Sequence, residues 1–247
     1  MTAEVSDTSV MGSDRSGELI AYARNLEARD ADVAVRIDDA TELLRRVDDV
    51  RARAERARLE LAALPEEIAR AEQAISEAQA RAAAARREAA ETERRLEELQ
   101  SSKRAREDTR TAAERAVRRA TVRATDAAGG VAWQQERLRA LLSDQVALHA
   151  DADGLAVEAR TVARDVAELP RLSDSGRTAP GASLVEIEEW GARAHSAIFV
   201  VRGGLESERE RIVLEASGLA ASVLGEQVAG ASVALVRRRL EQALGQT

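Results

Sequence analysis

The stretch "ATDAAGGVAWQQERL", residues 124–138, places two adjacent glycines, Gly129 and Gly130, inside a long run of helix-forming sequence. Glycine weakens a helix interior by roughly 1 kcal/mol and is common where a helix ends. The chain therefore either reverses at these glycines, as a helical hairpin, or continues through them as a straight rod. The residues on both sides help to distinguish the two.

Apolar residues on both sides of the glycines follow a heptad repeat, the pattern typical of coiled coils. We call its a and d positions the seam. Before the glycines the seam comprises Leu43, Val47, Val50, Ala54, Ala57, Leu61, Leu64, Ile68, Ala71, Ile75, Leu96 and Leu99. After them it continues in the same phase as Val131, Gln134, Leu138, Leu141, Gln145, Leu148, Ala152, Leu155, Ala159, Val162, Val166 and Leu169. All but six of the Val, Leu and Ile residues from 43 to 169 lie on this repeat, the exceptions being Leu44, Leu59, Val122, Leu142, Val146 and Val157.

Charges beside the seam disfavour a parallel pair of chains. Such a pair would oppose Arg46 with Arg51, Arg53 with Arg58, Glu67 with Glu72, Arg81 with Arg86, and Glu88 with Glu93. Each repulsion costs a few tenths of a kcal/mol, by analogy with like charges on one helix. Leu at d with Val or Ile at a favours parallel dimers, but alanine fills much of the seam and blurs that preference.

A reversal at Gly129 and Gly130 explains a second feature of the seam. Three cations occupy seam positions, where a charge is costly unless it is paired. The reversal brings them beside two carboxylates from the other side of the glycines. We therefore prefer the hairpin to the rod, with candidate polar seam contacts at Lys103, Arg106, Arg110, Asp151 and Asp153.

The predicted fold class is all-α: a long antiparallel coiled-coil hairpin or elongated helical bundle, with a smaller C-terminal helical unit. Residues 1–16 contain no signal-peptide pattern and are expected to be a disordered tail, with Met11 as an alternative start. Pro65 either kinks one helix or begins another. The predicted segments are helices at about 17–64, 66–128 and 131–169, a linker at 170–183, and the C-terminal unit at 184–247. The "SLVE" capping box, Ser183 to Glu186, opens that unit, and "AIFVVR" within it is a helix or a lone strand.

Composition excludes several functional classes. The 247 residues are 45% hydrophobic and 33% charged but only 2% aromatic, which is typical of long helices rather than of a large globular core. The absence of cysteine excludes disulfides, Cys-ligated zinc and Cys nucleophiles. No apolar run reaches the roughly 20 residues of a transmembrane helix, so a cytoplasmic location is expected. The preference for Arg over Lys is typical of a bacterial high-GC composition and carries no functional weight.

Motifs for chemistry are sparse, so no catalytic, cofactor or metal residue is predicted. His149, Asp151 and Asp153 suggest a metal site only weakly, because Asp151 points away from the other two and no second His lies nearby. His195 beside Trp190 is interpreted as a packing or surface residue. Nucleic-acid binding by "SSKRAR" or "VRRRLEQ" is disfavoured, since no aromatic residue lies among their cations.

The segment from Leu214 to Val236 has only two charged residues, Glu215 and Glu226. It forms either the core of the C-terminal helices or a docking face for a partner or a membrane surface. The candidate interaction surface comprises Leu219, Val223, Val228, Val233, Val236, Arg237, Arg238, Arg239 and Leu240.

These features predict a non-enzymatic coiled-coil structural or adaptor protein that forms homo-oligomers and binds protein partners. An enzyme is disfavoured because long exposed helices offer few enclosed pockets. The alternative is a membrane-surface scaffold with peripheral membrane contact, similar in broad outline to bacterial helical-hairpin membrane-stress proteins.

Overall fold

The computed structural model describes residues 8–102, 106–225 and 232–244, and all of its regular elements in these ranges are helices. They are α1 (Thr8–Ser101), α2 (Glu107–Ala167), α3 (Asp174–Arg177), α4 (Leu184–Leu224) and α5 (Val233–Leu244). The all-α prediction is confirmed, and "AIFVVR" is part of α4 rather than a strand.

The chain divides into two compact units, and both long helices contribute to each of them. Unit 1 combines Met1–Ala54 with Leu155–Thr247, and unit 2 is Glu55–Gly154. Unit 2 is the simpler one, because only α1 and α2 form it.

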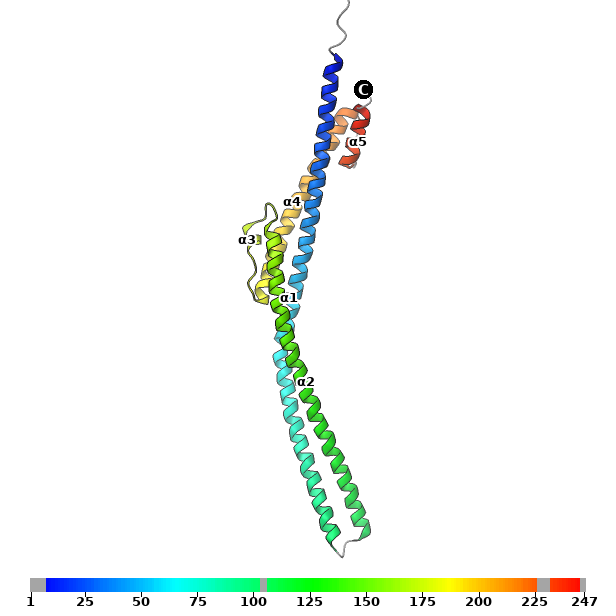
Figure 1. The fold of residues 1–247 in the computed structure, drawn as a ribbon, viewed down its shortest axis with the longest axis vertical. Coiled ribbons are helices and arrows are strands. Elements are labelled where there is room, and N and C mark those ends of the chain that lie inside the picture. Colours follow the sequence, from blue (N-terminus) through cyan, green and yellow to red (C-terminus); the bar gives the residue numbers. More distant parts are fainter. Residues whose placement is uncertain (1–7, 103–105, 226–231, 245–247) are drawn as a thin grey trace, which may run out of the picture. The chain divides into compact units, whose positions relative to one another are not determined.

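Unit 2 is an antiparallel hairpin of α1 and α2, which lie side by side in Figure 1. The ion pair between Arg123 and Glu88, 2.8 Å long, fixes how the two helices align. The predicted seam residues of this unit are buried or half-buried, whereas Val122 and Leu142, which lie off the seam, are exposed. The predicted antiparallel coiled-coil hairpin is therefore confirmed.

The predicted position of the turn is wrong. Gly129 and Gly130 lie inside α2, and the chain reverses between Ser101 and Glu107. The glycines are exposed, while the seam residues on either side of them, Ala127 and Val131, are half-buried, so α2 keeps its packing on both sides of the glycines. Each glycine costs only about 1 kcal/mol in a helix interior, which packing along the seam offsets.

Two other predicted boundaries are corrected as well. Pro65 does not divide the chain into two helices, since α1 runs through it. A proline in a helix removes one hydrogen bond, but here it is exposed while its neighbour Leu64 is buried against the seam. Helix α1 also begins at Thr8, within the predicted tail, because extending an existing helix adds one hydrogen bond per residue fixed. Residues 1–7 lie outside the described part of the chain.

The boundaries near the C-terminus agree better. Helix α2 ends at Ala167, close to the predicted end, although the predicted linker contains the single turn α3. Helix α4 begins after Ser183 with the predicted capping box, in which Ser183 and Glu186 exchange hydrogen bonds. Helix α4 also continues through Gly203 and Gly204.

In unit 1, α4 and α5 both run antiparallel to α1. His195 pairs with Asp48 at 2.8 Å, and Arg209 pairs with Asp30 at 2.9 Å. Residue numbers along α4 thus increase as those of the facing α1 residues decrease. For α5 the corresponding pairs are Arg237 with Glu27 and Glu241 with Arg24. The core between these helices and the end of α2 contains, among its largest fully buried side chains, Trp190, Leu26, Ile187, Ile198, Ile212, Leu240, Val47, Val50, Val162, Val166, Val233 and Val236.

Candidate protein-docking surface

Helix α4 buries one face and leaves large apolar side chains on the other. Ile198 and Val201 lie in the core of unit 1, whereas the intervening Phe199 and Val200 are 56% and 73% exposed. A helix turns once in about 3.6 residues, so an unbroken run of four large apolar residues cannot all face one core. The exposed pair is thus a direct product of the sequence "IFVV" at 198–201.

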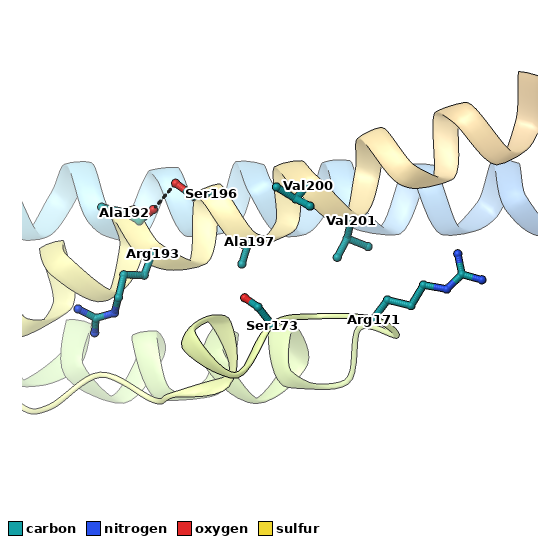
Figure 2. Close-up of a pocket in the computed structure, with 8 residues that line it drawn as sticks. All are labelled: Arg171, Ser173, Ala192, Arg193, Ser196, Ala197, Val200 and Val201. Atoms are coloured by element: carbon teal, nitrogen blue, oxygen red, sulfur yellow. Dashed lines mark hydrogen bonds between the residues drawn. The ribbon is translucent and has the colours of Figure 1, made fainter.

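A groove of about 510 Å³ lies beside Val200, between α4 and the segment that follows α2. Figure 2 shows Arg193 toward one end of it and Arg171 toward the other, with small uncharged side chains between them. Its lining residues are Arg171, Ser173, Ala192, Arg193, Ser196, Ala197, Val200 and Val201.

Gly176 holds the wall of the groove close to α4. A Cβ atom at this position would lie 2.7 Å from the Cβ of Ala197 and 3.1 Å from Cγ of Leu172, so any side chain would force the wall outward. Leu172 is buried, and its carbonyl accepts a hydrogen bond of 3.3 Å from Nε of Arg177. The wall is therefore held by the packing of Leu172 and by the hydrogen bond from Arg177.

The two arginines at the ends of the groove are exposed and only weakly engaged. Arg171 pairs with Glu208 at 3.3 Å, and Arg193 pairs with Glu189 at 3.9 Å. Exposed ion pairs contribute about 0–1 kcal/mol, so carboxylates of a partner can replace these internal ones at little cost. Arg171 also has φ 63°, a left-handed conformation that is unfavourable for a residue with a side chain and that clusters at binding sites.

Phe199 is held in place by its neighbours on α4. Its ring stacks on His195, with centroids 6.5 Å apart and the planes 6° from parallel. The guanidinium carbon of Arg202 lies 5.5 Å from the ring centroid, within cation–π range. His195 is in turn fixed by Asp48 through a 2.8 Å contact. An aromatic side chain ordered in advance loses little conformational entropy when it binds.

The predicted polar contacts across the seam do not form, because the turn lies elsewhere. Arg110, Asp151 and Asp153 all belong to α2, and a helix separates the first two by about 60 Å. Arg110 instead donates to the carbonyls of Leu99 and Ser102, at 3.2 and 2.9 Å, and so caps the end of α1.

The other cations of that prediction also lie at the turn. Arg106 is exposed just before α2, and Lys103 lies outside the described residues. A run of cations at seam positions thus indicates the point where the two helices stop packing, and it is the sequence signal that could have located the turn.

Of the two alternatives for the apolar C-terminal segment, a helix core or a docking face, the structure shows the core for the main apolar residues. Val233, Val236 and Leu240 are buried in the core of unit 1, and Leu219 and Val223 pack against that core. A membrane surface or partner could reach the three buried residues only if α5 detached. Val228 lies outside the described residues.

The arginines of that surface differ among themselves. Arg237 is half-buried and pairs with Glu27 and Glu241. The side chains of Arg238 and Arg239 are exposed. Hydrogen bonds from Arg24 and Arg237 hold the pKa of Glu241 below its usual value. These contacts attach α5 to α1 and are structural.

His149, the histidine of the weak metal-site candidate, has a partner in its own helix. His149 contacts the carbonyl of Gln145 in its own helix at 2.7 Å. Among the described residues, no group of three or more His, Asp and Glu side chains is arranged to hold a metal ion. None of the helices described combines the length and apolarity required to cross a bilayer.

Sequence reasoning missed the groove and its neighbours Phe199 and Arg171. Phe199 and Val200 were identifiable, because they fall off the apolar stripe that includes Ile198 and Val201. The groove itself depends on how the segment after α2 returns to α4, which no local pattern encodes.

Comparison with known protein families, curated proteins and solved structures gives no match.

Proposed function

We propose that this protein is a non-enzymatic helical adaptor that associates with itself and docks a partner protein on the exposed side of α4. The observation that carries the docking proposal is the pairing of two exposed apolar side chains, Phe199 and Val200, with the groove that has an arginine at each end. Exposed apolar patches with polar rims mark interaction sites, and aromatic and arginine side chains dominate binding energies.

The groove also indicates the chemistry of the partner. Its floor is apolar and its ends are cationic, so the matching segment carries apolar side chains between carboxylates. Phe199 supplies a pre-ordered aromatic contact at the edge.

A photoreactive amino acid at Val200 tests the proposal in cells of the source organism. We expect a crosslinked partner at Val200 that is absent when the same group replaces Val157, which is also an exposed valine of unit 1, at 60%. The purified partner should bind Val200→Glu about tenfold more weakly than the unmodified protein, because the added carboxylate is desolvated in the groove. Val157→Glu should bind normally. Equal crosslinking at both positions, or unchanged affinity for Val200→Glu, would refute docking at α4.

A further inference from the structure

A second groove, of about 420 Å³, lies in unit 2 between α1 and α2. Its floor is apolar, formed by Ala63, Leu64, Leu141, Ala147 and Leu148, and its rim carries Glu60, Glu67, Asp144 and Asp151. All four carboxylates are exposed. Among the described residues none of the four has an ion pair.

The rim brings like charges together, contrary to the pattern elsewhere on this edge of the two helices. Arg123 pairs with Glu88. Three heptads from that pair along both helices, Glu67 meets Asp144, and a fourth heptad brings Glu60 to Asp151. Two successive repulsive pairs destabilise the hairpin unless cations from outside neutralise them.

The same side of α2 carries an exposed aromatic residue, and it carries cations that could neutralise the rim carboxylates of another copy. Trp133 is 62% exposed. Arg119 lies two heptads before it, and Ala147, in the floor of the groove, lies two heptads after it. Residues spaced by whole heptads share one side of a coiled-coil helix. Arg119 and its neighbour Arg115 are exposed and have no ion pair within the ranges that the structure describes.

The equal spacing has a geometric consequence for two copies placed antiparallel. Trp133 lies about 21 Å from Arg119 and from Ala147 along the helix axis. A twofold axis at Trp133 therefore brings Arg119 of each copy to the level of Ala147 in the other. Arg115 reaches the level of Asp151 in the same way.

We infer that the groove of unit 2 is occupied by a second copy of this chain, antiparallel, with Trp133 of both copies near the twofold axis. Arg115 and Arg119 of each copy neutralise the rim carboxylates of the other. The contact is self-complementary, as a twofold dimer requires. This dimer rests on the self-association in the proposed function and assigns the surface that mediates it. Docking of a partner at α4 is independent of the dimer.

Charge reversal in the full-length chain tests this dimer by sedimentation over a concentration series. We expect Glu67→Arg with Asp144→Arg to weaken dimerisation at least about tenfold, and Arg115→Glu with Arg119→Glu to do the same, because each creates like charges across the interface. An equimolar mixture of the two double variants should dimerise again, since opposite charges then face each other. Asp153→Arg, on α2 but outside the groove, is the matched control and should dimerise normally.

Trp133 provides a second readout that separates misfolding from lost dimerisation. Its fluorescence should become less accessible to acrylamide as the unmodified protein dimerises, and should stay accessible in each double variant alone. Helical content by circular dichroism should be the same in all variants. A chain that is monomeric throughout, that dimerises regardless of these reversals, or whose mixed variants fail to associate overturns the inference. A monomer whose groove instead binds an arginine-rich peptide overturns it as well, while docking at α4 would still stand.

Discussion

Two glycines of α4, Gly191 and Gly203, lie in opposite environments. A Cβ atom at Gly191 would lie 2.9 Å from the Cβ of Arg51, so the missing side chain allows α4 to approach α1 closely. A Cβ atom at Gly203 would meet nothing within 4 Å. The same substitution at the two positions should therefore change stability in opposite directions.

Gly203→Ala should stabilise the protein by about 1 kcal/mol through helix propensity. Gly191→Ala gains the same term but adds an atom to a filled contact, which typically costs 1–3 kcal/mol, for a net loss on the order of 1 kcal/mol. Urea unfolding followed by the fluorescence of the buried Trp190 measures both. If Gly191→Ala were as stabilising as Gly203→Ala, the close approach of the two helices would be disproved.

Arg110 acts on the turn of unit 2 by capping the carbonyls of Leu99 and Ser102. Arg110→Ala should destabilise the hairpin by about 2 kcal/mol, since hydrogen bonds from charged groups contribute about 1.5–3 kcal/mol. Arg110→Lys should not restore this, because an ammonium lacks the fork that reaches two carbonyls. Thermal unfolding monitored by circular dichroism gives the comparison, with the exposed Arg106→Ala as the control that should change little.

Glu241 makes the attachment of α5 dependent on pH. Its pKa is lowered by hydrogen bonds from Arg24 and Arg237, so the carboxylate stabilises the folded state above its ordinary pKa of 4.5. That stability is lost as the pH falls below 4.5 and through the lowered value. Unfolding experiments between neutral pH and pH 3 should therefore show a steeper loss for the unmodified protein than for Glu241→Gln. Parallel curves for the two proteins would contradict the assignment.

At the scale of helices, α2 explains which features the sequence could reveal. The spacing of apolar residues predicts helix, seam and antiparallel pairing, because it follows from the geometry of one helix face. It does not locate the turn, since the seam positions 103, 106 and 110 continue the same phase across it. Gly129 and Gly130 gave a false signal, because an exposed glycine in a long helix costs little.

The same limit applies to the candidate sites. The groove beside α4 requires the return path of residues 171–177, and the groove of unit 2 requires the register of the hairpin. Once the turn is misplaced, every predicted contact across the seam changes with it. The apolar residues of α5 predict a helix face that is either core or docking surface, and only the packing of α5 in unit 1 shows that it is core.

Distances between spin labels distinguish the observed turn from the predicted one. Ala80→Cys with Ala132→Cys places one label on each arm of unit 2, at exposed alanines. These labels should be roughly 20 Å apart, given helices 10–12 Å in diameter. Asp108→Cys with Ala150→Cys lies along α2 and should give about 63 Å. Short distances in the second pair would restore the turn at the glycines. The absence of native cysteine makes both double variants specific.

At the scale of the whole molecule, unit 1 joins the first part of the chain to the last. Leu240 of α5 is fully buried, whereas Leu235 of the same helix is 41% exposed. Leu240→Ala should destabilise unit 1 by about 2–5 kcal/mol, and Leu235→Ala much less. Hydrogen exchange should show the loss of protection in α4, α5 and residues 15–54, with the arms of unit 2 unaffected. Equal losses in both units would mean that the two unfold together.

The shared use of α1 by both units has a consequence for synthesis on the ribosome. The two arms of unit 2 are joined by a short connection and can pack together as soon as α2 has been synthesised. Contacts between residues that are near in sequence form fastest. The first part of α1 must wait for α4 and α5, which are translated after α2. A chain that stops before α4 and α5 therefore leaves Leu26, which is fully buried in the complete unit, without the helices that cover it. Unit 1 can therefore fold completely only after α5 has been translated.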